Sequence, residues 1–129
     1  MKKIIYSPGE PSGIGPDLII KLSSSNLWED LKIPVVSIGD PKLFLDRAAL
    51  LKKKIRIIGL ESLSQVSKNS KGLIQIIKVT KCSNTRPGKL YKSNAQYVLD
   101  NLTYSIKQTM QNEGTALVTG PLSLSLIHI

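Results

Sequence analysis

Cysteine, aromatic residues and long apolar runs are all scarce in this sequence. Cys82 is the one cysteine in 129 residues, which excludes an internal disulfide framework and any all-cysteine metal cluster. The apolar run within residues 1–6 is interrupted by PGEPSG too early to form a signal-peptide core or a membrane span. We therefore expect a soluble cytoplasmic protein with no membrane partner, in which Cys82 is a small core or surface residue.

Acidic residues are half as frequent as basic ones, 9 against 18, and the formal net charge is +9. Such a charge is compatible with a nucleic-acid partner. Most lysines are scattered, however, with one cluster at residues 52–56, and 5% of aromatic residues leaves little for base stacking. A solvated lysine-rich surface without nucleic acid is the simpler interpretation, and a positive field also suits phosphate-bearing small molecules. A small basic RNA-binding α/β domain stays open as an alternative.

Apolar runs of strand length alternate with segments of helical periodicity along the chain. Pro16 and the pair Asp40–Pro41 are typical of helix starts, and Gly114 is typical of a helix end. Strands that are apolar on both faces and alternate with helices predict a mostly parallel sheet, and hence an α/β fold in a partial three-layer α/β/α domain. The expected strands are residues 3–6, 34–38, 55–58, 73–79 and 115–118, and the expected helices are residues 16–24, 41–51 and 93–113.

Two glycine-proline turns follow predicted strands: PGEPSGIGP at residues 8–16 and TGP at residues 119–121. Ligands of parallel α/β sheets collect outside the carboxyl ends of the strands. Gly13 and Gly15 would let the backbone approach a ligand, and the helix that begins at Pro16 favours an anion there. The alternative is that these glycines only make a tight strand-to-helix connection, since the turn matches neither GxGxxG nor GxxxxGK[ST].

Charged residues near these turns each have two interpretations. Glu10 either orients a polar ligand or a lysine, or accepts hydrogen bonds from the amides of its own turn. Asp17 falls in the first helical turn, where interaction with the helix dipole is favoured over catalysis. Arg86 and Lys89, in the segment RPGK, could meet a phosphate, although exposed loop cations are usually solvated.

Four stretches, in the same order, resemble the 4-hydroxythreonine-4-phosphate dehydrogenase (PdxA) family. The shorter core GIGPD also resembles the GIGPE segment of isocitrate and isopropylmalate dehydrogenases, a wider superfamily that shares the fold. The resemblance extends to Ser123, so we expect residues 1–123 to be the N-terminal part of such an α/β subunit. The four stretches are GEPSGIGPDLIIKL (9–22), PVVSIGDPKLFLDRAALL (34–51), PGKLYKSNAQYVLDNL (87–102) and ALVTGP (116–121).

The resemblance implies an NAD-dependent oxidation of 4-phosphooxy-L-threonine, followed by loss of carbon dioxide to give 3-amino-2-oxopropyl phosphate, in pyridoxal phosphate biosynthesis. It also implies a divalent metal (Zn, Mg or Co) as Lewis acid, NAD as hydride acceptor and a homodimer with its active site between two α/β domains. Carried over residue by residue, it implies that Glu10, Gly13, Gly15, Thr119 and Gly120 line the cleft for the phosphate substrate and the cofactor.

The sequence departs from the family after the TGP turn. Where the family commonly has a lysine three positions after the proline, this chain has Leu124. The family's metal-binding histidines and its GHTE segment lie further downstream, and His128 stands in no matching motif. We therefore assign no metal ligand and no catalytic residue here, and we expect the chain alone to be inactive. A non-catalytic α/β interaction module is a further alternative.

The last six residues, LSLIHI at positions 124–129, have an independent explanation. The codons CTG TCT CTT ATA CAC ATC encode them, and these nucleotides are a transposon end used as an adapter in sequencing libraries. We hypothesise that residues 124–129 are a non-native tail. The superfamily resemblance also implies that later strands complete the sheet. Residues 1–123 alone are therefore expected to expose apolar surface or an unpaired strand edge and to be aggregation-prone or loosely folded.

Overall fold

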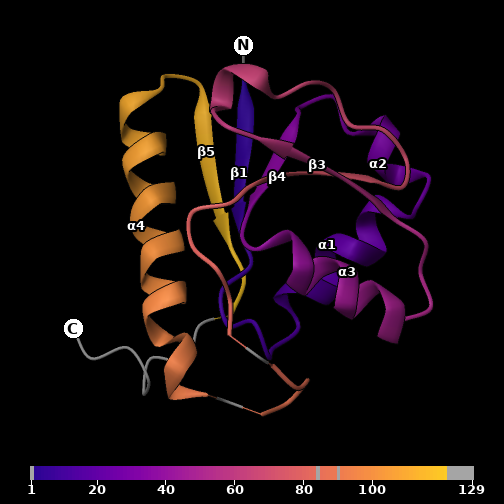
Figure 1. The fold of residues 1–129 in the computed structure, drawn as a ribbon. Helices are drawn as coiled ribbons and strands as arrows, with labels where there is room; N and C mark the ends of the chain where they lie inside the picture. Colours follow the sequence, from indigo (N-terminus) through magenta and orange to yellow (C-terminus); the bar gives the residue numbers. More distant parts are fainter. Residues whose placement is uncertain (1, 84, 90, 122–129) are drawn as a thin grey trace.

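The computed structural model describes residues 2–83, 85–89 and 91–121. Its strands are β1 (Lys3–Ser7), β2 (Val35–Ile38), β3 (Arg56–Leu60), β4 (Leu73–Ile77) and β5 (Thr115–Thr119). They form a five-stranded sheet in the order β3-β4-β2-β1-β5, in which every neighbouring pair is parallel (Figure 1). Strand β2 is buried along its whole length, as expected of a central parallel strand.

Helical segments cover both faces of this sheet. They are α1 (Gly15–Ser23), α2 (Leu27–Asp30), α3 (Pro41–Leu50), η1 (Leu63–Gln65), η2 (Lys92–Asn94) and α4 (Ala95–Gln111). Helices α1, α2 and α3 pack on one face, whereas η1 and the later turns of α4 pack on the other (Figure 1). Tyr97 and Val98, in the first turn of α4, reach the cluster of the first face. The predicted α/β fold with three layers is confirmed.

The core divides between the two faces because successive strand residues point to opposite sides of a sheet. Tyr6 of β1 packs with Trp28 and Phe44 in the cluster below α1, α2 and α3. Ile5, its neighbour in the chain, packs with Leu63 in the cluster on the opposite face. A one-residue slip of β1 would exchange these two sets, so the register of the sheet is strongly specified.

The predicted elements all form, with ends that differ by at most two residues. The strand expected at residues 73–79 ends at Ile77, and the helix expected at residues 93–113 runs as α4 from Ala95 to Gln111 after the short turn η2. The start predicted for the second helix is also confirmed, because Asp40 accepts a 3.1 Å hydrogen bond from the Lys42 amide.

Helix α2 is an element that the sequence pattern does not predict. Its four residues are too few for an apolar periodicity. Trp28 is 1% exposed, and its indole N–H donates a 3.1 Å hydrogen bond to the carbonyl of Leu73. A contact between residues 45 positions apart therefore stabilises this helix. No helix in the described residues is long and apolar enough to cross a membrane.

Candidate functional site at the carboxyl edge of the sheet

The two glycine-proline turns meet where β1 and β5 end side by side. The Glu10 amide donates a 3.0 Å hydrogen bond to the Pro121 carbonyl, and the Gly120 amide donates one of 2.7 Å to the Ser7 carbonyl. Thr119 lies beside Ser7 in the register of the sheet. The tertiary structure thus brings the first and the last predicted cleft segments together at one edge.

Glycine is required at this junction because backbone atoms of the two turns are in direct contact. A Cβ atom on Gly15 would lie 1.8 Å from the carbonyl oxygen of Pro8, and one on Gly120 would lie 2.1 Å from the same atom. The Tyr6 hydroxyl also donates a 2.8 Å hydrogen bond to the carbonyl of Gly15. These contacts favour the alternative left open by the sequence, in which Gly15 makes a tight connection.

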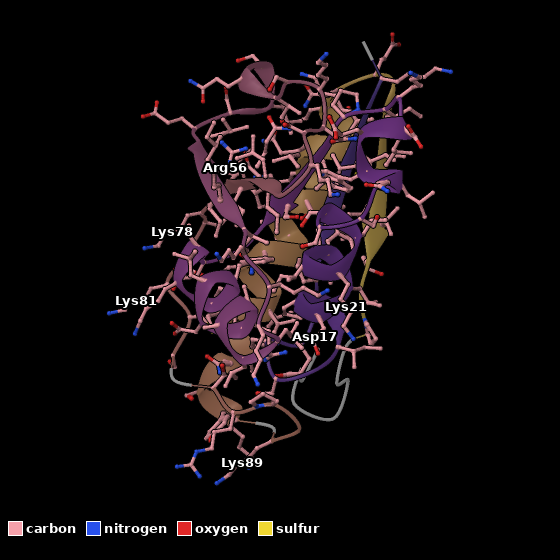
Figure 2. All side chains as sticks on the ribbon, turned by 90° about the vertical axis from the view of Figure 1, so that its right-hand side faces the viewer. Asp17, Lys21, Arg56, Lys78, Lys81 and Lys89 are labelled. Atoms are coloured by element: carbon pink, nitrogen blue, oxygen red, sulfur yellow. The ribbon has the colours of Figure 1, made fainter. Side chains whose placement is uncertain are left out.

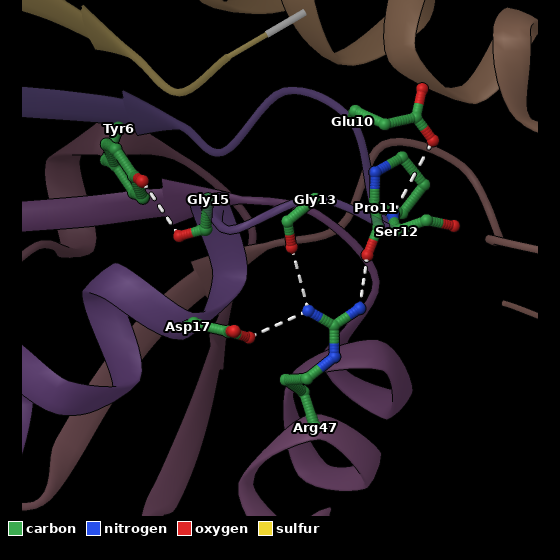
Figure 3. A network of polar contacts seen from close by, with 8 residues as sticks. All are labelled: Tyr6, Glu10, Pro11, Ser12, Gly13, Gly15, Asp17 and Arg47. Atoms are coloured by element: carbon green, nitrogen blue, oxygen red, sulfur yellow. Dashed lines mark hydrogen bonds and ion pairs between the residues drawn. The ribbon is translucent and has the colours of Figure 1, made fainter. Parts of the chain in front are cut away.

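Arg47 of α3 stabilises the first turn from below (Figure 3). Its guanidinium group donates hydrogen bonds to the carbonyls of Pro11 at 2.6 Å and Gly13 at 2.9 Å, and to the Asp17 carboxylate at 2.7 Å. Arg47 is 3% exposed, so these acceptors replace the water that its charge would otherwise bind. One side chain therefore determines the course of the turn and its junction with α1.

Arg47 is a site residue that the sequence reasoning missed. The apolar stripe of the predicted helix includes Phe44 and Ala48, and Arg47 lies on the same face between them. An arginine on a buried stripe needs hydrogen-bond acceptors, since an unpaired buried charge is very costly. The sequence signal for this role was therefore a charged residue within the apolar stripe of the predicted helix. The dipole interaction expected for Asp17 is compatible with its place in the first turn of α1, and the ion pair is an additional role.

Glu10 is 6% exposed and lies inside the first turn. The Ser12 amide is 3.5 Å from its Oε1 atom, at the long limit of a hydrogen bond, as expected for a carboxylate that bonds its own turn (Figure 3). Burial raises the pKa of the Glu10 carboxyl, and the weak bond from Ser12 lowers it by less. This buried carboxyl therefore retains its proton to a higher pH than an exposed glutamate does.

A second set of hydrogen bonds connects the segments after β2 and β4 with the start of α4. The Asp40 carboxylate accepts a 2.8 Å hydrogen bond from the Cys82 amide, and the Asn94 side-chain oxygen accepts one of 2.9 Å from the Ser83 amide. Burial, together with the smaller effects of the nearby carboxylates of Asp40 and Glu10, raises the pKa of the Cys82 thiol to about 12. The thiol stays protonated at neutral pH, so the expected structural role of Cys82 is consistent with its surroundings.

The segment RPGK forms a tight turn that packs on the first glycine turn. The Lys89 amide donates a 3.1 Å hydrogen bond to the Arg86 carbonyl, and Gly88 has a φ of +80°, as a type II turn requires. The Gly88 amide donates a 2.7 Å hydrogen bond to the carbonyl of Ser12. Arg86 and Lys89 are exposed, and both line a pocket of about 550 Å³ between α3 and this turn.

Basic residues are otherwise spread over the molecule. Figure 2 shows Arg56, Lys78 and Lys81 along one side, with Lys89 at the end of the molecule that carries the RPGK turn. Within the described residues, Arg47 and Asp17 form the one ion pair. The basic residues on this side of the surface are thus scattered, as the sequence indicated. The pocket beside the RPGK turn differs, because several cationic side chains line it.

The family follows from a match over most of the chain. Residues 30–129 match the model of the pyridoxal phosphate biosynthetic protein PdxA. The chain belongs to the PdxA family. Its curated relatives include a 4-hydroxythreonine-4-phosphate dehydrogenase from Citrobacter koseri, 31% identical over 99% of this chain, and one from Yersinia pseudotuberculosis, 32% identical over 98%. The PdxA chain described here spans 38% and 37% of the lengths of these two relatives.

Solved structures of proteins named 4-hydroxythreonine-4-phosphate dehydrogenase share the fold of this PdxA chain. A 4-hydroxythreonine-4-phosphate dehydrogenase from Klebsiella pneumoniae superimposes with a TM-score of 0.84 at 24% identity, covering 98% of this chain and 39% of the other. One from Burkholderia phymatum gives 0.83 at 16% identity, covering 98% and 38%. At such identities the likeness establishes the fold, and it agrees with the parallel α/β sheet of this PdxA chain.

Proposed function

We propose that this chain is part of a dehydrogenase that oxidises 4-phosphooxy-L-threonine with NAD and releases carbon dioxide, giving 3-amino-2-oxopropyl phosphate. The observation that carries the proposal is the junction of the two glycine-proline turns, in a chain that aligns over 99% of its length with a relative named for this dehydrogenase. The junction lies at the carboxyl ends of parallel strands, the edge at which α/β sheets bind small molecules.

In this proposal the two turns form one wall of the substrate and cofactor cleft. Gly15 and Gly120 act through the close packing that joins the turns, whereas Gly13 receives the hydrogen bond from Arg47. Glu10 and Thr119 contribute the side chains of the wall. Residues 1–123 are the N-terminal part of the subunit, and a cytoplasmic homodimer completes the active site.

The divalent metal that the family resemblance implies has no set of ligands in this part of the subunit. Among the described residues, no group of three or more His, Cys, Asp and Glu side chains could hold a metal ion. These residues do not fit a metal centre, and we derive no metal-dependent step from them. In the proposal, parts of the full-length subunit outside this chain hold the metal.

A chimera tests the proposal directly. Residues 1–121 replace the aligned segment of the Citrobacter koseri relative, and NADH formation from 4-phosphooxy-L-threonine is followed by absorbance. We expect turnover, because the segment carries the same wall of the cleft. The matched control replaces the segment with its Gly15→Ala, Gly120→Ala variant, which we expect to be inactive. A folded chimera without turnover would contradict the proposed function.

The chain alone is expected to be inactive under the same conditions. NADH formation by the 129-residue chain above a blank without enzyme would show that the missing walls are not needed. The proposed tail at residues 124–129 lies outside the described residues, and the nucleotides of the gene test it. Codons other than those of the transposon end would refute the adapter origin.

A further inference from the structure

The pocket between α3 and the RPGK turn combines a substantial volume with an excess of cations. Its volume is about 550 Å³, which is within the range of small-molecule sites. The lining includes four cationic side chains and two carboxylates: Lys42, Arg47, Arg86, Lys89, Asp40 and Asp46. The pocket also lies where β2 and β4 end, since Asp40 and Cys82 line it and follow these strands.

Within the described residues, neither carboxylate forms an ion pair with Lys42, Arg86 or Lys89. Both oxygens of Asp40 accept hydrogen bonds from backbone amides, those of Lys42 and Cys82. Asp46 is exposed on α3 and forms no ion pair within the described part of the chain. The side-chain charges of Lys42, Arg86 and Lys89 are therefore available to a ligand, as far as the described residues show.

The position of the RPGK turn is set before any ligand arrives. Its backbone bond to Ser12 and its internal Arg86–Lys89 bond fix the backbone from which the side chains of Arg86 and Lys89 line the pocket. The Lys89 ammonium lies 5.3 Å from the centre of the Tyr91 ring, which restrains it further. Arg47 adds a charge that is 3% exposed and cannot move away, since three acceptors hold it. Preorganised cations lose less entropy on binding an anion.

We propose that this pocket binds the phosphate group of a small molecule, with Lys42, Arg86 and Lys89 as its ligands. A phosphate accepts several charge-assisted hydrogen bonds, which suits three convergent cations better than a carboxylate does. The phosphate belongs either to the pyrophosphate of a dinucleotide or to a phosphomonoester. That choice of ligand rests on the proposed function, whereas phosphate binding itself does not.

Isothermal titration of the 129-residue chain with inorganic pyrophosphate at low ionic strength tests the site. We expect saturable binding that weakens as salt is added, because the attraction is electrostatic. The double variant Arg86→Ala, Lys89→Ala should weaken it by at least about tenfold, since the loss of even one charge-assisted bond costs about that factor. The backbone bonds of the RPGK turn do not involve these side chains, so the turn should remain in place.

Controls separate this site from general attraction to a basic protein. Lys53→Ala, Lys54→Ala removes the same charge from the exposed residues after α3 and should leave pyrophosphate binding within about twofold. Lys42→Ala is a second, independent test, expected to weaken binding about tenfold. Equal losses in the Lys53, Lys54 variant and the Arg86, Lys89 variant would overturn the proposal, as would the absence of saturable binding.

Competition identifies the source of the phosphate. Displacement of pyrophosphate by NAD would assign the pocket to the cofactor, and displacement by 4-phosphooxy-L-threonine would assign it to the substrate. Displacement by neither would refute the small-molecule site. Failure of the chimera to turn over, with pyrophosphate binding intact, would count against the dehydrogenase and leave the phosphate site standing.

Discussion

Arg47 of α3 and Asp17 of α1 form an ion pair of 2.7 Å between two helices that are separated by α2 and β2 in the chain. The arginine is 3% exposed and the aspartate 23%. Because the same guanidinium also binds two carbonyls of the first turn, the pair couples the packing of the helices to the shape of the proposed cleft.

Replacing Arg47 by methionine should destabilise the fold by about 3–5 kcal/mol, because it leaves the carbonyls of Pro11 and Gly13 and the Asp17 carboxylate without their donor. Asp17→Asn should cost less, about 1 kcal/mol, since a neutral acceptor remains. Urea unfolding measures both changes. The control Lys42→Met lies on the exposed side of α3 and should change stability by no more than about 0.5 kcal/mol. A similar small effect of Arg47→Met would contradict the role assigned to it.

Gly15→Ala distinguishes helix propensity from turn packing. Alanine is favoured over glycine in a helix by about 1 kcal/mol, so propensity alone predicts a gain at the first residue of α1. The structure predicts a loss of about 3 kcal/mol, since the new Cβ would lie 1.8 Å from the Pro8 carbonyl oxygen. Gly59→Ala is the matched control, because nothing lies within 4 Å of its added Cβ. Thermal unfolding of both variants decides between the two effects.

Glu10→Gln should make the protein more stable near neutral pH. Burial raises the folded-state pKa of Glu10 above the ordinary value of 4.5, so the folded state binds more protons and stability falls as pH rises from the unfolded pKa through the folded one. Glutamine does not titrate, so the variant should lack this decrease and show no gain well below pH 4.5. Melting temperatures measured across this range check the sign. A variant that is less stable near neutral pH would show that the charged carboxylate has a favourable partner.

Cys82 should react slowly with thiol reagents in the folded chain. Its pKa of about 12, compared with 9.0 for a free thiol, reduces the thiolate fraction about a thousandfold. The rate of reaction with a disulfide reagent at mildly alkaline pH measures this, and the urea-unfolded chain is the reference. Equal rates in the two states would mean that the segment around Cys82 opens readily.

Exposed apolar side chains beside β5 should make the isolated chain self-associate. Leu18 and Val118, about half exposed, line an apolar groove of about 220 Å³ beside this edge strand. Leu18→Lys, Val118→Lys should shift sedimentation velocity profiles toward monomer. Met110→Lys on α4 is the control, because its side chain is 82% exposed but lies outside the groove. A wild-type chain that is already a monodisperse monomer would refute the expected aggregation.

The sequence by itself determined the elements, their order and the parallel sheet, because the apolar periods and the helix-start residues are local signals. Asp40 and Pro41 begin α3 as their types predict, and buried runs such as PVVSI form central strands. The short helix α2 escaped prediction because its stabilising contact, from Trp28 to Leu73, joins residues far apart in the chain.

Only the tertiary structure decided how the candidate site is assembled. The glycine and proline residues of the sequence predict the turns at Gly15 and Gly120 separately. The contact of both turns with Pro8 depends on β1 and β5 being neighbours in the sheet. The role of Arg47 depends on hydrogen-bond acceptors that lie 30 to 36 residues away in the chain. The sequence of α3 alone does not identify these acceptors. Strand order and long-range hydrogen bonds come from packing of the whole domain, and local sequence patterns do not specify them.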